Sequence, residues 1–389
     1  MDSAVGPISI LEGRPRIMLG SNNYLGLGNH PAITEGARNA LCAMGGSTTG
    51  TPPLNGTTSL VLTLEEELAD WHETEDALVF TSGYQANLGT VAALLGAGDT
   101  AILDVEAHAS LHDGARLSGA GIRTFPHNDV AALRRQLERV SGRRGLALVV
   151  IDGLYSMRGD LAPIDRIAAL TKEFGFPLMV DEAHSIGVMG ARRTGAVELF
   201  GAESDVEIRM GALSKGMGST GGFIAGRRTL TDALRLHARA LLFSTSAAPA
   251  ALGSSLAAVR LVRSPEGAEL ASAANANAVR LRNLLLDAGI DVGGISKLPT
   301  GEVVVAPNLS IVIGDDVRTI RAWRYAFENG VFCAAALQPA VASDGGLLRL
   351  SVMATHTESQ LQQAAEIVAD AVQNHGISRA TERSEQTVA

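Results

Sequence analysis

The chain has 389 residues, of which 46% are hydrophobic and 19% are charged, the composition of a globular protein and not of a disordered or fibrous one. Its formal net charge of -9 argues against sequence-independent binding of nucleic acid, which needs clustered cations. No apolar run reaches the roughly 18 residues that a membrane-spanning helix requires.

The opening segment, MDSAVGPISILEGRPRIML, lacks the basic and then apolar plan of a secretory signal. The two cysteines, Cys42 and Cys333, form neither a metal-binding spacing nor a disulfide framework. We therefore expect a cytoplasmic protein. Because domains usually have roughly 100–200 residues, the length favours two of them.

The first predicted elements are an irregular N-terminal arm, which ends in a short helix, and a Gly/Thr/Pro stretch over residues 45–58. Composition alone favours a flexible linker for this stretch. The helix that follows carries three acidic residues in a row, which we expect to face away from its apolar stripe. The stripe consists of Leu60, Leu64, Leu68 and Trp71, and the acidic residues are Glu65, Glu66 and Glu67.

Between about residues 77 and 226, short apolar strands alternate with amphipathic helices. Apolar strands separated by helices indicate a mainly parallel sheet with helices on both faces, so the predicted fold class is α/β. A smaller C-terminal α+β domain is expected around NANAVRLRNLLLDAG, NLSIVIG and LLRLSVM. The strands predicted in the first domain are ALVFT, AILDV, LALVVID, PLMVD, IRMGAL and GGFIAG. The predicted ranges are 1–40 for the arm, 41–255 for the large domain, 256–375 for the small domain and 376–389 for a flexible tail.

Polar residues follow several of the predicted strands, at the edge where open α/β sheets bind their ligands. Ser82-Gly83 follows the first strand, at a helix start whose N–H groups suit a phosphate, although an isolated Ser-Gly pair is more often an ordinary turn. The other residues that follow strands in this way are His108, Asp152, Asp181 and His184. Each also has a plain structural explanation, such as a surface histidine, a helix cap or a salt bridge. A metal site on Asp181 and His184 is disfavoured, because no further ligand stands at a supporting spacing.

Lys215 is one of only three lysines, with Lys172 and Lys297, and it lies in GALSKGMG directly after a predicted strand. Its neighbours are uncharged, whereas Lys172 stands on a polar helix. A lysine in an apolar or cationic pocket loses its proton more easily and becomes an amine able to form a Schiff base. An amine, a strand-end acid, a phosphate-binding helix start and a flat side chain together suit pyridoxal 5'-phosphate (PLP).

Six motifs together resemble the α-oxoamine synthases, which are fold-type I PLP enzymes. The motifs are SNNYLGLGNHP, TSGYQANLG, AHASLHDG, DGLYSMRGDLAP, VDEAHSIGVMG and GALSKGMGSTGG. The resemblance extends over about residues 20–370. In the details LNGT, DEAHS and LLRLSVMATHT the chain is most similar to the serine palmitoyltransferase and 8-amino-7-oxononanoate synthase branches of that family.

The resemblance implies a role for each matching position. Lys215 would hold PLP covalently, Asp181 would pair with the pyridine nitrogen, and His184 would bond the ring hydroxyl. His108 would stack on the ring, and Arg349 would bind the substrate carboxylate as a planar fork. The remaining implied positions are Ser82, Gly83 and Tyr84 at the phosphate, Ser156 beside the ring hydroxyl, Ser214 next to the lysine, and Asn22 in the substrate pocket.

The implied reaction is a decarboxylative Claisen condensation of an amino acid with an acyl thioester, on coenzyme A or an acyl-carrier protein, which gives an α-aminoketone. Ser244 and Thr245 match a segment that reaches the phosphate of the partner subunit, so the resemblance implies a homodimer with shared active sites. The alternatives are an aminotransferase or aldol-type lyase on the same fold and, more remotely, a non-catalytic partner subunit. Such a subunit is expected to lose the lysine.

Three positions depart from the family pattern, and the N-terminal arm is shorter than usual. Pro52 replaces an arginine of the glycine-rich loop, Leu337 replaces an arginine near the C-terminus, and Ala212 replaces a threonine that meets the phosphate. Loss of the two arginines should weaken binding of anionic groups such as those of coenzyme A. We therefore expect a specialised enzyme whose acyl group arrives on a carrier protein.

Overall fold

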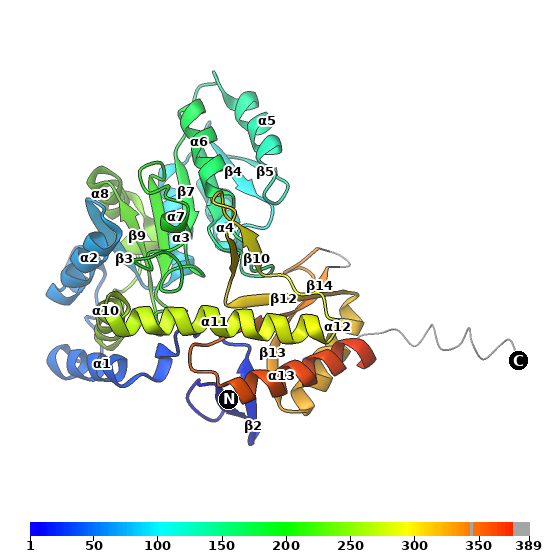
Figure 1. Cartoon of the computed structure of the whole chain (residues 1–389). Coiled ribbons are helices and arrows are strands. Elements are labelled where there is room, and N and C mark those ends of the chain that lie inside the picture. The colour runs from blue at the N-terminus through cyan, green and yellow to red at the C-terminus, as the bar shows by residue number, and fades with distance from the viewer. Residues whose placement is uncertain (343–344, 376–389) are drawn as a thin grey trace, which may run out of the picture. The chain divides into compact units, whose positions relative to one another are not determined.

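The computed structural model describes residues 1–342 and 345–375, and the chain forms two compact units (Figure 1). The larger unit comprises Leu27–Ser156 and Leu161–Ala271. The smaller unit comprises Met1–Gly26, Met157–Asp160 and the described residues from Ser272 onward. The predicted tail at 376–389 lies outside the described residues. Among the helices that the structure describes, none is both long and apolar enough to cross a membrane.

A seven-stranded sheet forms the centre of the larger unit, in the order β3-β9-β8-β7-β6-β4-β5. Strands β4 to β8 pair in parallel, while β9 pairs antiparallel with both of its neighbours. The prediction of a mainly parallel sheet is confirmed. The strands are β3 (Asp76–Phe80), β4 (Thr100–Asp104), β5 (Gly121–Phe125), β6 (Ala147–Asp152), β7 (Leu178–Asp181), β8 (Ile208–Ala212) and β9 (Gly222–Gly226).

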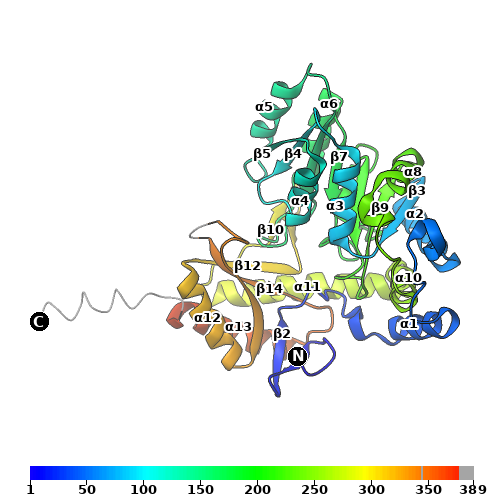
Figure 2. The same cartoon turned by 180° about the vertical axis from the view of Figure 1, so that it is seen from behind.

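Helices cover both faces of this sheet. Helix α6 lies in front of the sheet in Figure 1, and α3 and α4 lie in front of it in the opposite view of Figure 2. The apolar residues of α3 and α4 pack with one face of the strands, for example Val91 and Leu111 with Leu103 and Val150. The helices are α1 (Pro31–Met44), α2 (Ser59–His72), α3 (Gly83–Leu94), α4 (Ala109–Ser118), α5 (Val130–Val140), α6 (Ile164–Phe174), α7 (Ala196–Leu199), α8 (Arg228–His237), α9 (Arg239–Leu242) and α10 (Pro249–Arg263), with short turns η1 (Leu27–Asn29) and η2 (Pro52–Gly56).

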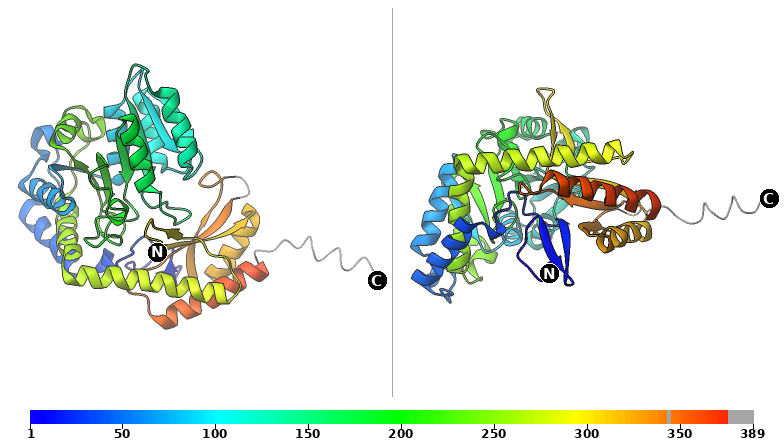
Figure 3. Two further views of the ribbon diagram at one scale, coloured as in Figure 1. Left: turned by 45° about the horizontal axis from the view of Figure 1, so that its top comes forward. Right: turned by 60° about the horizontal axis from the view of Figure 1, so that its bottom comes forward.

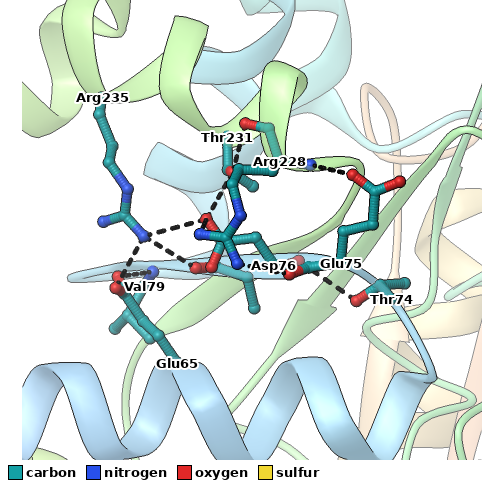
Figure 4. Close-up of polar contacts among 9 residues, drawn as sticks. Glu65, Thr74, Glu75, Asp76, Val79, Arg228, Thr231 and Arg235 are labelled. Atoms are coloured by element: carbon teal, nitrogen blue, oxygen red, sulfur yellow. Dashed lines mark hydrogen bonds and ion pairs between the residues drawn. The ribbon is translucent and has the colours of Figure 1, made fainter.

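Glu65 on α2 corrects one sequence prediction, because its side chain is buried instead of facing outward. Its carboxylate accepts hydrogen bonds from the backbone N–H of Val79 and from Arg235, both at 2.9 Å. Figure 4 shows Arg235 reaching from α8 to Glu65 and to Asp76 on β3. Burial raises the pKa of Glu65, and the positive charge of Arg235 opposes that rise. The helical period of α2 did not reveal this partner, which lies far away in the sequence.

The smaller unit contains a five-stranded sheet in the order β1-β2-β13-β14-β12. The first residues form a hairpin that joins this sheet through β2 and β13, so the prediction of an irregular arm was wrong there. The long helix α11 and the shorter helix α13 bury apolar residues in one core and lie side by side in Figure 3. Helix α11 (Pro265–Asp287) begins in the larger unit and enters the smaller one at Ser272. The other elements of the smaller unit are β1 (Ile8–Leu11), β2 (Arg14–Leu19), β10 (Ile295–Lys297), β11 (Val303–Val305), β12 (Asn308–Gly314), α12 (Asp316–Glu328), β13 (Val331–Ala336), β14 (Gly346–Ser351), α13 (Glu358–Asp370) and η3 (Ala371–His375).

Candidate active site

Two carboxylic acids and a lysine follow neighbouring strands at one edge of the seven-stranded sheet. Asp152 ends β6 and lies opposite Asp181, which ends β7. Lys215 comes three residues after the end of β8, which pairs with β7. Because parallel strands end at the same edge, the sheet brings these groups together from positions far apart in the sequence.

The start of α3 provides backbone donors at the same edge. The Ser82 side chain caps the helix by accepting the N–H of Gln85 at 3.2 Å. Within the described chain, no hydrogen-bond partner is present for the N–H groups of Gly83 and Tyr84. A Cβ on Gly83 would lie 2.9 Å from the end of the flexible Met210 side chain and 3.2 Å from the Cβ of Ala212, so glycine suits the close approach of this helix start to β8. Unpaired N–H groups at a helix start bind anions such as phosphate.

Asp181 is buried, with 4% of its surface exposed. Its carboxylate accepts hydrogen bonds from the Ala183 N–H at 2.8 Å and from the Asn87 side-chain amide at 2.6 Å. Among the described residues, no ion pair is present at this carboxylate. A buried carboxylate is costly without a cation, so this one suits a positively charged ring nitrogen.

The pKa of the His108 imidazole depends on the charges of both Asp181 and Lys215. Burial lowers the pKa of its imidazole, Asp181 raises it, and Lys215 lowers it. The same two charges act on Asp152, where burial and then Asp181 raise the carboxyl pKa while Lys215 lowers it. The backbone N–H of His108 also donates to Asp152 at 3.1 Å. The charges of Lys215 and Asp181 therefore reach the same two groups, as a shared site requires.

The other predicted residues of this unit differ in their surroundings. His184 is buried and Ser156 is partly buried, while Ser214 beside the lysine is exposed. The Tyr84 hydroxyl donates to Asp113 on α4. Ser244 and Thr245 line a cavity of about 310 Å³, which Phe80 and Thr81 at the end of β3 also line. Within the described chain, no hydrogen bond joins Ser244 or Thr245 to the group around Asp181.

Asn22 and Arg349, the two predicted substrate-binding residues, lie together in the smaller unit. The Arg349 guanidinium donates to the Asn22 side-chain oxygen and, at 3.4 Å, to the Ser351 hydroxyl. The Tyr24 hydroxyl donates to the same Asn22 oxygen at 3.4 Å. Burial raises the pKa of Tyr24 to about 12, although the charge of Arg349 opposes the rise. The arginine is 8% exposed and is held by this polar group in a fixed orientation.

Sequence reasoning did not give roles to four buried polar residues near the predicted ones. Asn87 and Ser110 are hydrogen-bonded to each other at 3.0 Å, and both contact predicted site residues. Glu182 accepts the N–H groups of Ala196 and Val197 at 2.8 and 2.7 Å, which anchors the start of α7 beside β7. Asp152 was noted as a strand-end acid but received no role. Two signals could have found them. Asn87 stands four residues after Gly83, about one helical turn along α3, and Asp152 ends a strand that pairs in register with the strand ended by Asp181.

The residues present fit PLP. The group offers anion-binding N–H groups at α3, a buried carboxylate for a cationic ring nitrogen, and a lysine amine. Position 212, where the resemblance leads us to expect a threonine, is a buried alanine at the end of β8. One hydroxyl is therefore absent from the set of groups proposed to bind the phosphate. The fit therefore depends on backbone donors more than on side-chain donors at the phosphate.

The family model for aminotransferase class I and II matches residues 14–368. The chain belongs to the aminotransferase class I and II family. It is 42% identical over 366 residues to an 8-amino-7-oxononanoate synthase of Geobacter metallireducens, a match that covers 94% of this chain and 90% of that one. A serine palmitoyltransferase of Caulobacter vibrioides is 40% identical over 352 residues, covering 90% and 84% of the two chains.

Solved structures agree with this membership. The serine palmitoyltransferase of Sphingomonas wittichii superposes with a TM-score of 0.90 at 33% identity and covers 97% of this chain and 92% of its own. A further serine palmitoyltransferase structure that contains PLP gives a TM-score of 0.89 at 31% identity, with coverage of 95% and 91%. The predicted fold type, the resemblance to α-oxoamine synthases, the PLP dependence and the acyltransferase class are all confirmed.

Proposed function

We propose that this chain joins an amino acid to an acyl thioester by decarboxylative condensation and releases an α-aminoketone, carbon dioxide and a free thiol. The observation that carries the proposal is the placement of Asp181 at the end of β7 and of Lys215 just after β8, which are neighbouring parallel strands of one sheet. A new bond forms between the α-carbon of the amino acid and the thioester carbonyl carbon. The carbon–sulfur bond of the thioester and the carbon–carboxylate bond of the amino acid break.

Lys215, Asp181 and the start of α3 are the residues that would hold PLP. When bound there, PLP withdraws electrons from the α-carbon of the amino acid, which makes that carbon acidic. In the proposal, Asp181 keeps the ring nitrogen positively charged, and the N–H groups of Gly83 and Tyr84 bind the phosphate. Ser82 belongs to this phosphate site as the cap that orients the helix start. His184 and Ser156 are proposed at the ring hydroxyl, and the exposed Ser214 flanks the lysine.

The lysine amine is the group proposed to move the α-proton. Lys215 is partly buried after β8, in a segment without other charged side chains. An amine in such surroundings gives up its proton more readily than one on a polar helix. His108 covers the ring in the proposal and orients the substrate, so that the bond to be broken has a fixed direction.

Arg349 is proposed to bind the carboxylate of the amino acid, with Asn22 in the same pocket. A guanidinium offers two parallel donors that match the two oxygens of a carboxylate. The hydrogen bonds to Asn22 and Ser351 support this role, because they hold the fork in one orientation before substrate arrives. Orientation in advance lowers the entropic cost of binding.

The protein is proposed to act as a cytoplasmic homodimer with shared active sites. Ser244 and Thr245 support a shared site, because they match the family segment that reaches the phosphate of the partner subunit. In the proposal, Ser244 and Thr245 bind the cofactor phosphate in the active site of the partner subunit. Chemical crosslinking or light scattering of the purified protein tests the dimer, and a monomer with full activity would remove it.

The acyl donor is proposed to be an acyl-carrier protein. Pro52 stands where the family has an arginine and lines the cavity with Ser244 and Thr245. The charged side chains that line this cavity are Glu65 and Arg235, which pair with each other. Among the described residues that line the cavity, none therefore offers an unpaired cation to the phosphates of coenzyme A.

Product analysis tests the reaction directly. Purified enzyme supplied with amino acids and an acyl thioester should release carbon dioxide and thiol in equal amounts, and Lys215→Ala should abolish both. Formation of a keto acid without thiol release would instead make the protein an aminotransferase. Turnover of free acyl-CoA as fast as acyl-carrier protein would end the proposal of a carrier-bound donor.

A further inference from the structure

A continuous hydrogen-bonded chain links Asp181 to His108. The Asn87 amide nitrogen donates to Asp181 Oδ2 at 2.6 Å and to Ser110 Oγ at 3.0 Å. Ser110 Oγ lies 2.7 Å from His108 Nδ1, and the Ser110 backbone N–H donates to the same ring nitrogen at 3.3 Å. Asn87 and Ser110 are 1% and 0% exposed, so water does not compete for these bonds.

The direction of each proton follows from the donors and acceptors. Asn87 turns its NH₂ group toward Asp181, so one N–H donates to that carboxyl group and the second N–H points to Ser110. Ser110 accepts that bond and directs its own proton to His108 Nδ1. A backbone N–H can only donate, so its contact with Nδ1 also requires an unprotonated nitrogen. The imidazole proton therefore resides on Nε2.

We propose that Asn87 and Ser110 are positioning residues that fix His108 as the neutral Nε2–H tautomer, so that it faces substrate as a hydrogen-bond donor and not as a base. The role of His108 toward substrate rests on the proposed function, whereas the hydrogen bonds that set its tautomer do not depend on that function. Within the described chain, His108 Nε2 has no hydrogen-bond partner, which leaves its proton available for a carboxylate or carbonyl oxygen of substrate.

Asn87 uses both of its side-chain N–H groups in this hydrogen-bonded chain, one on Asp181 and one on Ser110. Among the described residues, its side-chain oxygen has no hydrogen-bond partner. The orientation of the amide is therefore set by its two donor contacts.

The electrostatic surroundings of His108 agree with a neutral ring. Burial lowers its pKa, Lys215 lowers it further, and the charges of Asp181 and Asp113 act in the opposite direction. Protonation of Nδ1 would also place a proton against the Ser110 N–H, which has no means of accepting it. Both effects disfavour the imidazolium form.

Nitrogen NMR of the full-length protein labelled with ¹⁵N-histidine tests the tautomer without relying on turnover. The nine histidines are separated by assigning the His108 signals through their loss in His108→Gln. In wild type we expect an unprotonated Nδ1 and a protonated Nε2. A protonated Nδ1 in wild type would overturn the proposal, even if every variant failed to fold.

The variants test the relay itself. Ser110→Ala removes one hydrogen bond to Nδ1 and should shift the tautomer ratio toward Nδ1–H by roughly fivefold, while Ser110→Thr should restore it. Asn87→Ala should act in the same direction. Ser255→Ala is the matched control, because it removes another buried hydroxyl, bonded to Ser219 and Thr220, and should leave the His108 signals unchanged.

Two outcomes separate this inference from the proposed reaction. An unchanged His108 tautomer ratio in Ser110→Ala would overturn the relay and leave the condensation proposal intact. The expected NMR shifts in an enzyme that releases no carbon dioxide would uphold the relay and remove the proposed reaction.

Discussion

Asp152 and Asp181 lie opposite each other at the ends of the parallel strands β6 and β7, both almost fully buried. Burial first and the neighbouring Asp181 second raise the pKa of Asp152 well above its ordinary value. Two adjacent carboxyl groups seldom ionise together in a protein interior. Asp152 is therefore the member of the pair whose neutral form is favoured, and one of its carboxyl oxygens accepts the His108 N–H.

This difference predicts opposite results for two matched substitutions. Asp152→Asn replaces an acid whose raised pKa favours the neutral form by a neutral amide of the same shape, so PLP affinity should change less than about threefold, below the effect of one hydrogen bond. Asp181→Asn removes the charge opposite the ring nitrogen and should lower kcat/KM by roughly 10- to 100-fold. Absorbance titration with PLP and steady-state kinetics measure both. Equal losses in the two variants would refute the division of roles.

Glu182 gives a prediction about stability and pH. Burial raises its pKa from 4.5 to about 7, even though Ser185 and two backbone N–H groups lower it. The folded state binds this proton more tightly than the unfolded state, so its contribution to stability is complete below pH 4.5 and is lost as the pH rises to about 7. Relative to Glu182→Gln, wild-type stability should fall across this window by up to about 1.4 kcal/mol per pH unit.

Chemical denaturation at several pH values checks the Glu182 prediction. Glutamine cannot titrate, and its NH₂ group must face the Ala196 or the Val197 N–H, so the variant should be less stable by about 1–3 kcal/mol at low pH. The difference between the two proteins should narrow as the pH rises. A difference that stays constant from pH 4.5 to 7 would show that Glu182 does not titrate there.

Arg235 is predicted to contribute to stability through Glu65. Arg235→Ala leaves a buried carboxylate unpaired and should reduce the free energy of unfolding by roughly 2–3 kcal/mol, at the low end for a buried pair because part of Arg235 meets water. Arg228→Ala is the control, since that exposed arginine also pairs with Asp76 but should matter by less than about 1 kcal/mol. Urea titration compares the two, and equal effects would contradict a special role for Glu65.

Arg349 is predicted to affect the KM for the amino acid and not the KM for the thioester. Arg349→Lys keeps the charge but loses the planar fork, so KM for the amino acid should rise roughly 10- to 100-fold. KM for the acyl donor should stay within about twofold, because no hydrogen bond to that substrate is removed. Initial rates with each substrate varied in turn distinguish these constants. A rise confined to the acyl donor would remove the assignment of Arg349 to the carboxylate.

The strands that the sequence revealed are the ones buried on both faces. The apolar runs ending in Asp152 and Asp181 stand out because a parallel sheet covered by helices excludes polar residues. Strand β5 was missed because it lies at the edge, and four of its five residues are partly or fully exposed. The hairpin β1–β2 was missed because its partner, β13, lies more than 300 residues later in the chain. The domain boundary at residue 255 stays a prediction.

The candidate site was only partly visible in the sequence. Lys215, Asp181 and His108 stood at strand ends, where the rule for open sheets directs attention. Asn87 and Ser110 lie inside α3 and α4, and their importance depends on which helix faces which strand. Helical period alone does not specify that pairing. Glu65 shows the same limit, because a charged residue on an amphipathic helix is normally assigned to the surface.

We propose that Lys215 holds PLP covalently, and borohydride reduction of the purified enzyme tests this. Peptide mass spectrometry of the reduced protein then locates the attached cofactor among the three lysines. We expect a pyridoxyl group on Lys215, with Lys172 and Lys297 unmodified as internal controls. A modified Lys172 or Lys297 with an unmodified Lys215, or no attached cofactor at all, would contradict it.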